Sequence, residues 1–220
     1  VAGIAVPTVF YGRFGLLVSV GAIAGFWIMA VSLIDPIRSW RRAPGTPGMT
    51  RSVFGMSIAH FGVGMFTLGV TIVSAFTVER DLSVRPGESV EVAGYSFELN
   101  NLKNVQGPNY RALEGEVEIR RDGDFVAELR PQKRTYIVQQ NPMTEAGIDA
   151  GWNRDLFVAL GDPLGNDAWS MRLQYKPLIR FIWLGSLIMA LGGIVAASDR
   201  RYRQRAEASE RNAELSGEPA

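Results

Sequence analysis

The chain contains no cysteine and only one histidine, His60, among its 220 residues. The absence of cysteine excludes a disulfide framework and any thiolate metal site. Lys and Arg number 23 and Asp and Glu number 22, so no excess of positive charge favours nucleic acid as a partner. Glycine-rich phosphate loops, nucleophile elbows and the HExxH motif are also missing. His60 is therefore the first candidate for metal or cofactor chemistry.

Long apolar segments dominate both ends of the chain. Three of them are long enough to cross a hydrocarbon layer of about 30 Å as helices. They are predicted as transmembrane helices at residues 13–34, 53–76 and 177–198. Residues 1–12 are apolar but contain Pro7, and they are predicted to be the tail of an upstream element. Because the chain begins at Val1 without Met or a basic leader, we expect a piece of a longer membrane protein and not a signal peptide.

Arginine is concentrated in two of the segments between and after the predicted helices. The segment 35–52, predicted to be a short loop that begins at Asp35-Pro36, holds four arginines, and residues 199–220 begin with a second basic cluster. Positively charged loops stay on the cytoplasmic side of a membrane. Both segments are therefore expected in the cytoplasm, and residues 77–176 are expected in the periplasm of a bacterial inner-membrane, multi-pass protein.

Residues 77–176 have the composition of an antiparallel β domain. Short runs of β-branched and aromatic residues alternate with turn signals such as Asp122-Gly123. Strands are predicted near residues 79–84, 88–92, 95–102, 111–121, 124–130, 134–139, 154–160 and 168–175. The predicted fold is an integral-membrane α bundle with three spans in this chain and an inserted periplasmic β sandwich or small barrel. Residues 141–149 are interpreted as a surface connection, with a docking surface for a partner as the alternative.

The helix predicted at residues 53–76 carries His60 in an uncharged stretch. An ionisable ring inside a membrane span is a functional candidate by default. Gly64 follows one turn later on the same side, where bare backbone would leave room for a flat ligand such as a porphyrin. Gly55, Gly62 and Gly69 recur every seven residues and indicate a close helix–helix contact on another face. An interhelical hydrogen bond or a packing role for a neutral His60 remains an equally open interpretation.

Other residue patterns indicate structure and not chemistry. Glu114, Glu116 and Glu118 alternate with apolar residues, as in a solvated strand face. Trp40 and Trp183 fit interfacial anchors at span ends. The remaining three tryptophans are Trp27, Trp152 and Trp169, and packing is sufficient to explain them.

Several motifs together resemble a known family. They are MSIAHFGVG around His60, RTY at 134–136, PMTEAGIDAGWNRDLFVALGDP at 142–163, and the run from AWSMRLQYKP at 168–177 through the last span to Arg203. In this combination the chain resembles the C-terminal part of the CcmF-type cytochrome c biogenesis proteins, over roughly residues 13–203. The related assembly factor of nitrite reductase is similar.

The resemblance implies a haem lyase subunit. Such a subunit takes haem from a haem chaperone and joins it to the CxxCH cysteines of apocytochrome c, together with other maturation subunits. A histidine at the position of His60 is expected to be one of two axial ligands of a transmembrane haem b, with Gly64 beside it and with quinol as the candidate electron donor. The family's tryptophan-rich periplasmic haem-binding segment, its two flanking histidines and the second transmembrane ligand are absent from this chain, so by itself it is expected to be inactive.

Two hypotheses from other classes stay open. The first is a structural membrane module that docks partners through its β domain. The second is a haem-b quinol oxidoreductase that has no part in cytochrome maturation. A haem spectrum separates the first from the family interpretation, and the sequence upstream of Val1 separates the second.

Overall fold

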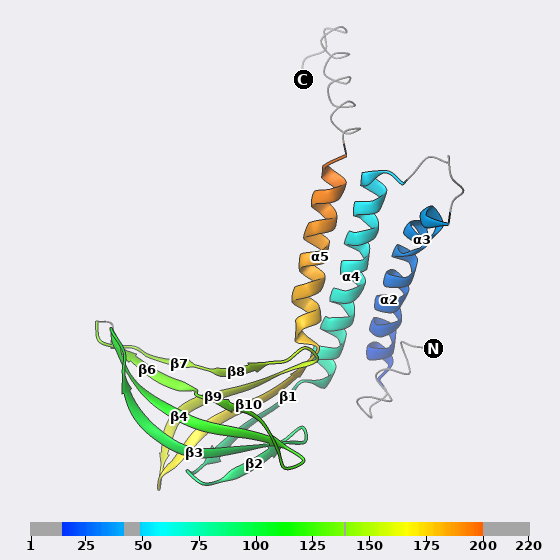
Figure 1. The fold of residues 1–220 in the computed structure, drawn as a ribbon. Helices are drawn as coiled ribbons and strands as arrows, with labels where there is room; N and C mark the ends of the chain where they lie inside the picture. The colour runs from blue at the N-terminus through cyan, green and yellow to red at the C-terminus, as the bar shows by residue number, and fades with distance from the viewer. Residues whose placement is uncertain (1–14, 42–48, 139, 200–220) are drawn as a thin grey trace. The chain divides into compact units, whose positions relative to one another are not determined.

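A computed structural model describes residues 15–41, 49–138 and 140–199 (Figure 1). It divides into two compact units. The helical unit contains the described residues up to Ile72 and those from Phe181 onward, and the β unit extends from Val73 to Arg180. Each unit is described by itself below.

The described residues contain three helical segments that are long and apolar enough to cross a membrane. The helices are α2 (Leu16–Ser32), α3 (Ile34–Trp40), α4 (Arg51–Phe76) and α5 (Ile179–Ala197). The first candidate span combines α2 and α3 over Leu16–Trp40. The three predicted spans are thus confirmed as helices, and residues 1–14, the 42–48 part of the predicted loop and the tail after 199 lie outside the described residues.

The predicted loop start at Asp35-Pro36 is wrong. The helix bends at Leu33 and continues as α3, whose first turn contains Pro36. Proline is tolerated in a first helical turn because the amide hydrogens there have no intrahelical acceptor. Pro36 therefore lies in the first turn of α3, which begins at Ile34, and does not end the helical segment.

Glycine brings α4 into close contact with α5. A Cβ atom added to Gly62 would lie 2.7 Å from the backbone oxygen of Gly185, and one added to Gly55 would lie 2.5 Å from that of Gly192. A Cβ atom added to Gly69 would likewise lie 2.9 Å from the backbone nitrogen of Ile182. The heptad stripe therefore forms a backbone-to-backbone helix contact, as its spacing predicted.

A second contact joins α4 to α2. The close pair here is Gly25 and Gly64, because a Cβ atom on Gly64 would lie 2.7 Å from the Gly25 oxygen. A Cβ atom on Gly21, one turn before Gly25, would lie 2.4 Å from the hydroxyl oxygen of Thr71. Helix α4 is therefore held on two faces, by α5 and by α2.

Hydrogen bonds at its first turn complete the placement of α4. The backbone N–H of Ser52 donates to the carboxylate of Asp199 at 3.0 Å, and that of Val53 donates to the Thr50 hydroxyl at 3.3 Å. A carboxylate at a helix N-terminus is favourable because the free amides there carry partial positive charge. The buried Asp199, which precedes the basic cluster after the last span, thus connects the end of α5 to the start of α4.

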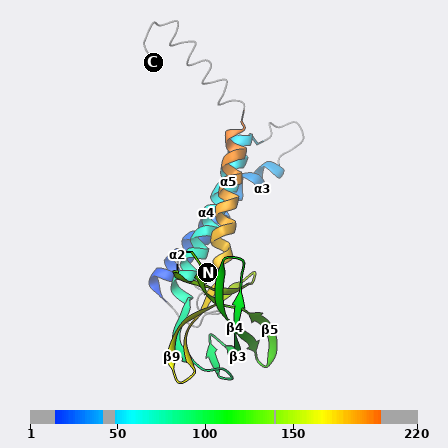
Figure 2. The same cartoon turned by 90° about the vertical axis from the view of Figure 1, so that its left-hand side faces the viewer.

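The β unit consists of two antiparallel sheets that face each other (Figure 1). One sheet has the order β1-β10-β9-β8, and the other has the order β2-β3-β4-β6-β7 with β5 beside β4 (Figure 2). Their bounds are β1 (Val78–Val84), β2 (Ser89–Val92), β3 (Tyr95–Gln106), β4 (Tyr110–Arg121), β5 (Asp124–Leu129), β6 (Gln132–Tyr136), β7 (Pro142–Glu145), β8 (Gly147–Ala150), β9 (Arg154–Gly165) and β10 (Ala168–Pro177).

Alternating side chains from both sheets form the core between them. Phe97, Ile119, Leu156 and Leu173 are almost completely buried. This period-two alternation is what makes a strand bury one face and expose the other. The predicted sandwich is confirmed, and the Asp122-Gly123 turn connects β4 to β5 as expected, with positive φ at both residues.

The interpretation of residues 141–149 as a surface connection is wrong. This segment forms β7, which pairs with β6 in one sheet, and β8, which pairs with β9 in the other. Ala146 separates the two strands, so the chain passes from one sheet to the other there. β7 is exposed along its whole length and has no alternating pattern that a sequence could reveal, and each strand has only four residues, so pairing with their neighbours defines them.

Candidate functional site

His60 lies near the middle of α4, and its ring is exposed on the surface of the helical unit. Its Nδ1 atom is 2.8 Å from the backbone oxygen of Met56, one turn earlier. A carbonyl oxygen can only accept a hydrogen bond, so Nδ1 carries the proton and donates it. In the neutral ring, Nε2 then has a free lone pair, and among the described residues no hydrogen-bond partner engages it. The geometry leaves Nε2 available to a ligand from outside this chain.

A hollow of about 300 Å³ adjoins His60 within the helical unit. Helices α2 and α3 contribute Trp27, Ile28, Val31, Ser32 and Asp35 to its wall, and α4 contributes Met56, Ser57 and His60. Most of this wall is apolar, with the Asp35 carboxylate as its one charged group. A flat apolar molecule could therefore lie against α2 while the imidazole approaches it from α4.

The role predicted for Gly64 beside a porphyrin does not fit the structure. Its bare backbone is covered by α2, with Met29 and Gly25 close enough to exclude even a methyl group. The glycine permits helix packing, and the open space near His60 lies on the side of Met56 and Ser57 instead. One-turn spacing could not distinguish these two uses, because both require a residue without a side chain.

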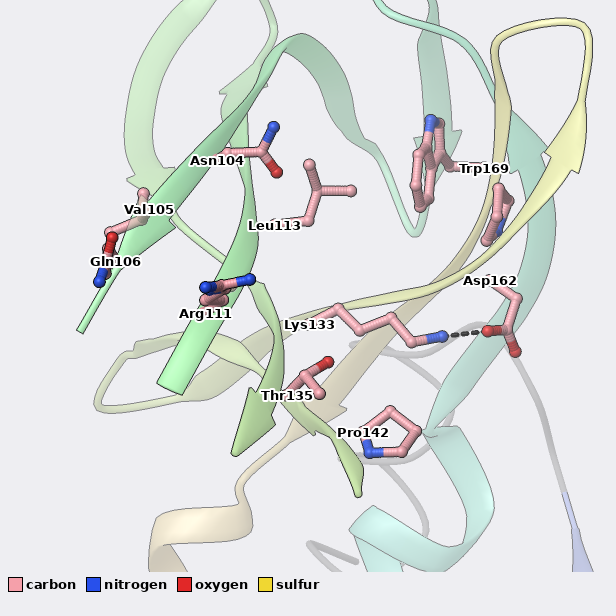
Figure 3. A pocket seen from close by; sticks show the side chains of 12 residues that line it. Asn104, Val105, Gln106, Arg111, Leu113, Lys133, Thr135, Pro142, Asp162 and Trp169 are labelled. Carbon is pink, nitrogen blue, oxygen red and sulfur yellow. Dashed lines mark hydrogen bonds and ion pairs between the residues drawn. The ribbon is translucent and has the colours of Figure 1, made fainter. Parts of the chain in front are cut away.

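A larger hollow, of about 650 Å³, lies in the β unit (Figure 3). Side chains of both sheets line it, including Leu113 and Lys133 from one sheet and Asp162 and Trp169 from the other. The Lys133 amine forms an ion pair with the Asp162 carboxylate across the hollow. In the part of the chain that the structure describes, no group of three or more His, Cys, Asp or Glu residues could hold a metal ion.

The glutamates of β4 have a structural role, and one of them departs from the prediction. Glu114 is buried, not solvated; it accepts a hydrogen bond from Gln132 at 2.5 Å and forms an ion pair with the Lys103 amine at 3.3 Å. Glu116 receives the same amine at 2.7 Å, and this hydrogen bond lowers the pKa of the Glu116 carboxyl. One lysine thus pairs with two carboxylates on the same strand face.

The class of protein follows from these elements. Three helices can cross a membrane, and the antiparallel sandwich is inserted in the sequence between α4 and α5, so the chain is a multi-pass membrane protein with an inserted β domain. Residues 75–177 match the family described as the CcmF C-terminal beta-sandwich. Over 97% of its length the chain is 44% identical to the cytochrome c-type biogenesis protein CcmF of Pseudomonas fluorescens, of which it covers 32%. It is 41% identical to the protein of the same name in Pseudomonas aeruginosa, over 95% of this chain and 32% of that one.

A solved structure supports the same assignment at the level of the fold. The cytochrome c haem lyase CcmF superimposes with a TM-score of 0.69, over 88% of this chain and 33% of that one, at 18% identity. The chain spans about a third of the length of the curated relatives it matches. It corresponds to the C-terminal part of a CcmF-type cytochrome c biogenesis protein, the family that its motifs resemble.

Proposed function

We propose that this chain is part of a haem lyase assembly for cytochrome c maturation and that His60 supplies one axial ligand of a transmembrane haem b. The observation that carries the proposal is the His60 ring, whose Nδ1 donates to the Met56 oxygen and whose Nε2 has no hydrogen-bond partner among the described residues. The second ligand would come from a helix outside this chain. Haem bound there would supply one-electron redox chemistry within the membrane.

The residues around His60 suit this role. Donation from Nδ1 to the Met56 oxygen at 2.8 Å fixes the tautomer and the ring orientation, as it does for most metal-binding histidines. The apolar wall of the hollow beside it, from Trp27 to Val31, would keep water away. A lone histidine exposed on a membrane helix also requires a partner, because an unsatisfied polar ring facing lipid is costly.

The location and the partners belong to the same proposal. The arginines at 38, 41, 42 and 51 favour a cytoplasmic position for the segment between the first two spans of an inner-membrane protein. The β unit would then lie in the periplasm, where a haem chaperone, apocytochrome c and other maturation subunits would reach it. Quinol is the proposed electron donor.

The experiment is His60→Ala in the full-length protein, with Val70→Ala as the matched control. Val70 is an exposed apolar residue of the same helix, nearly three turns away. His60→Ala should abolish the low-spin haem b spectrum and cytochrome c assembly without reducing membrane insertion, and added imidazole should restore part of the spectrum. Val70→Ala should leave all three readouts unchanged.

The same experiment distinguishes the alternatives. Full haem b content in the His60→Ala protein would contradict the proposal and favour a structural module that docks partners, for which the hollow of the β unit is the candidate surface. Loss of haem b with normal cytochrome c assembly would favour a haem-b quinol oxidoreductase.

A further inference from the structure

We propose that the turn between β8 and β9 is a lipid-binding loop and that Trp152 at its tip inserts its indole into the membrane interface. The turn consists of Gly151, Trp152 and Asn153, and β9 begins at Arg154. This inference depends on α5 crossing a membrane and is independent of whether His60 binds haem.

The register of the sheet places this turn level with the start of α5. Arg154 pairs with Pro177, the last residue of β10, and Trp152 lies two residues beyond Arg154. Helix α5 begins two residues beyond Pro177, at Ile179. Neighbouring antiparallel strands advance at the same rise per residue, so the tip of the turn and the first residue of α5 reach the same height.

A backbone hydrogen bond connects the two segments directly. The N–H of Leu178, immediately before α5, donates to the oxygen of Asn153 at 2.9 Å. Trp152 is therefore next to the residue at which the chain leaves the sandwich for its last span. A span that begins at this point enters the bilayer through its headgroup and upper acyl region, within reach of a side chain beside its first residue.

Hydrogen bonds hold the turn that carries Trp152 in one conformation. The Gly151 N–H donates to the Arg154 oxygen at 2.9 Å and closes the loop, and a Cβ atom on Gly151 would lie only 2.6 Å from that oxygen. The Arg154 guanidinium donates to both the backbone oxygen and the carboxylate of Asp149, at 3.2 and 2.5 Å, and to the Tyr95 hydroxyl at 3.2 Å. These hydrogen bonds thus join the β9 end of the turn to β8 and to β3 of the other sheet.

Exposure and residue type both favour lipid as the partner. Trp152 is 72% exposed, so the packing role that the sequence suggested for it is wrong. An indole combines a large apolar ring with one N–H donor and concentrates at membrane interfaces for that reason. Two cations at the same end, Lys176 and Arg180, have flexible stems that suit lipid phosphate groups. Both features suit an indole beside the first residue of a span for contact with lipid headgroups.

The test labels two single cysteines introduced into full-length protein that contains no other cysteine. Trp152→Cys reports on the proposed loop. Leu164→Cys is the matched control, because Leu164 is also an exposed large apolar residue next to a hairpin turn, at the opposite end of β9. About ten residues of strand, or roughly 30 Å at 3.3 Å per residue, separate them. Each protein is labelled with a fluorophore and placed in phosphatidylcholine vesicles.

The result that supports the proposal is a contrast between two quenchers. Lipid with a nitroxide near its headgroup should quench the label at residue 152 and leave the label at 164 unchanged, while aqueous iodide should do the reverse. Iodide quenching of the 152 label as strong as that of the 164 label would overturn the proposal. Protection of the 152 label from both quenchers would also overturn it and would show that protein covers the turn.

Discussion

Substituting Gly192 by alanine on α5 should destabilise the helical unit, whereas the same substitution at the next residue should not. A Cβ atom on Gly192 would lie 2.3 Å from the backbone nitrogen of Ala59 and 2.6 Å from the oxygen of Gly55, both on α4. A Cβ atom on Gly193 would have no atom within 4 Å among the described residues. Only the first substitution forces two backbones apart.

The magnitude follows from comparing the two variants. Both replace glycine by alanine inside one helix, so both gain the same helix propensity, about 0.5–1 kcal/mol. That gain cancels in the difference between them. What remains is the cost of inserting a methyl group into a filled contact, typically about 1–3 kcal/mol. Backbone atoms cannot rotate away as a flexible side chain can, so the upper part of this range is expected.

The assay is equilibrium unfolding of the full-length protein in detergent, followed by circular dichroism. Gly192→Ala should unfold more readily than Gly193→Ala, with folding constants that differ by about 5- to 150-fold, the equivalent of about 1–3 kcal/mol. If the two variants unfolded at the same denaturant concentration, α4 and α5 would not meet through their glycines, and the helix contact described above would be refuted.

Three further predictions concern the β unit and the topology. Hydrogen bonds from Arg172 lower the pKa of Asp81 below its ordinary value of 3.8, so Asp81→Asn should reduce stability at neutral pH. The pKa of Asp81 is lower in the folded than in the unfolded protein, so its contribution to stability is present above pH 3.8 and is lost as the pH falls through the folded-state pKa. The difference in stability between the Asp81→Asn protein and the unsubstituted protein should therefore disappear at low pH, which unfolding measurements at a series of pH values would show. The excised unit 73–180 should give a circular dichroism spectrum dominated by β structure and should bind no haem; a mainly helical spectrum would contradict the fold. An impermeant thiol reagent applied from the periplasm should label Asp124→Cys and not Gly45→Cys, and the reverse pattern would contradict the topology.

Local patterns in the sequence are sufficient for the class of fold. Each span follows from an apolar run long enough to cross a bilayer, and the sandwich follows from alternation and turn residues such as Asp122-Gly123. These signals need no knowledge of distant parts of the chain, because they report which side chains can be buried together on one helix or one strand. The heptad of Gly55, Gly62 and Gly69 likewise predicted a helix contact, although it could not identify α5 as the partner.

Tertiary structure decided which use each glycine and each short segment has. Gly64 was expected to leave space for a ligand, but α2 fills that space through Gly25. Residues 141–149 were expected to be a loop, but pairing with β6 and β9 makes them two strands. In both places the deciding neighbour lies far away in sequence, so no local pattern contains the information.

The candidate site shows the same division. His60 could be selected from the sequence alone, because a single ionisable ring in an uncharged span is costly without a purpose. The Nδ1 donation to Met56, which leaves Nε2 without a partner in the described part of the chain, required a folded helix, and the hollow beside it required α2 to pack against α4. Similarly, packing was sufficient to explain Trp152 from the sequence, and only the strand register places it beside the start of α5. The sequence specifies the type of each residue. The surroundings of a side chain depend on contacts that form only when segments distant in the sequence pack together.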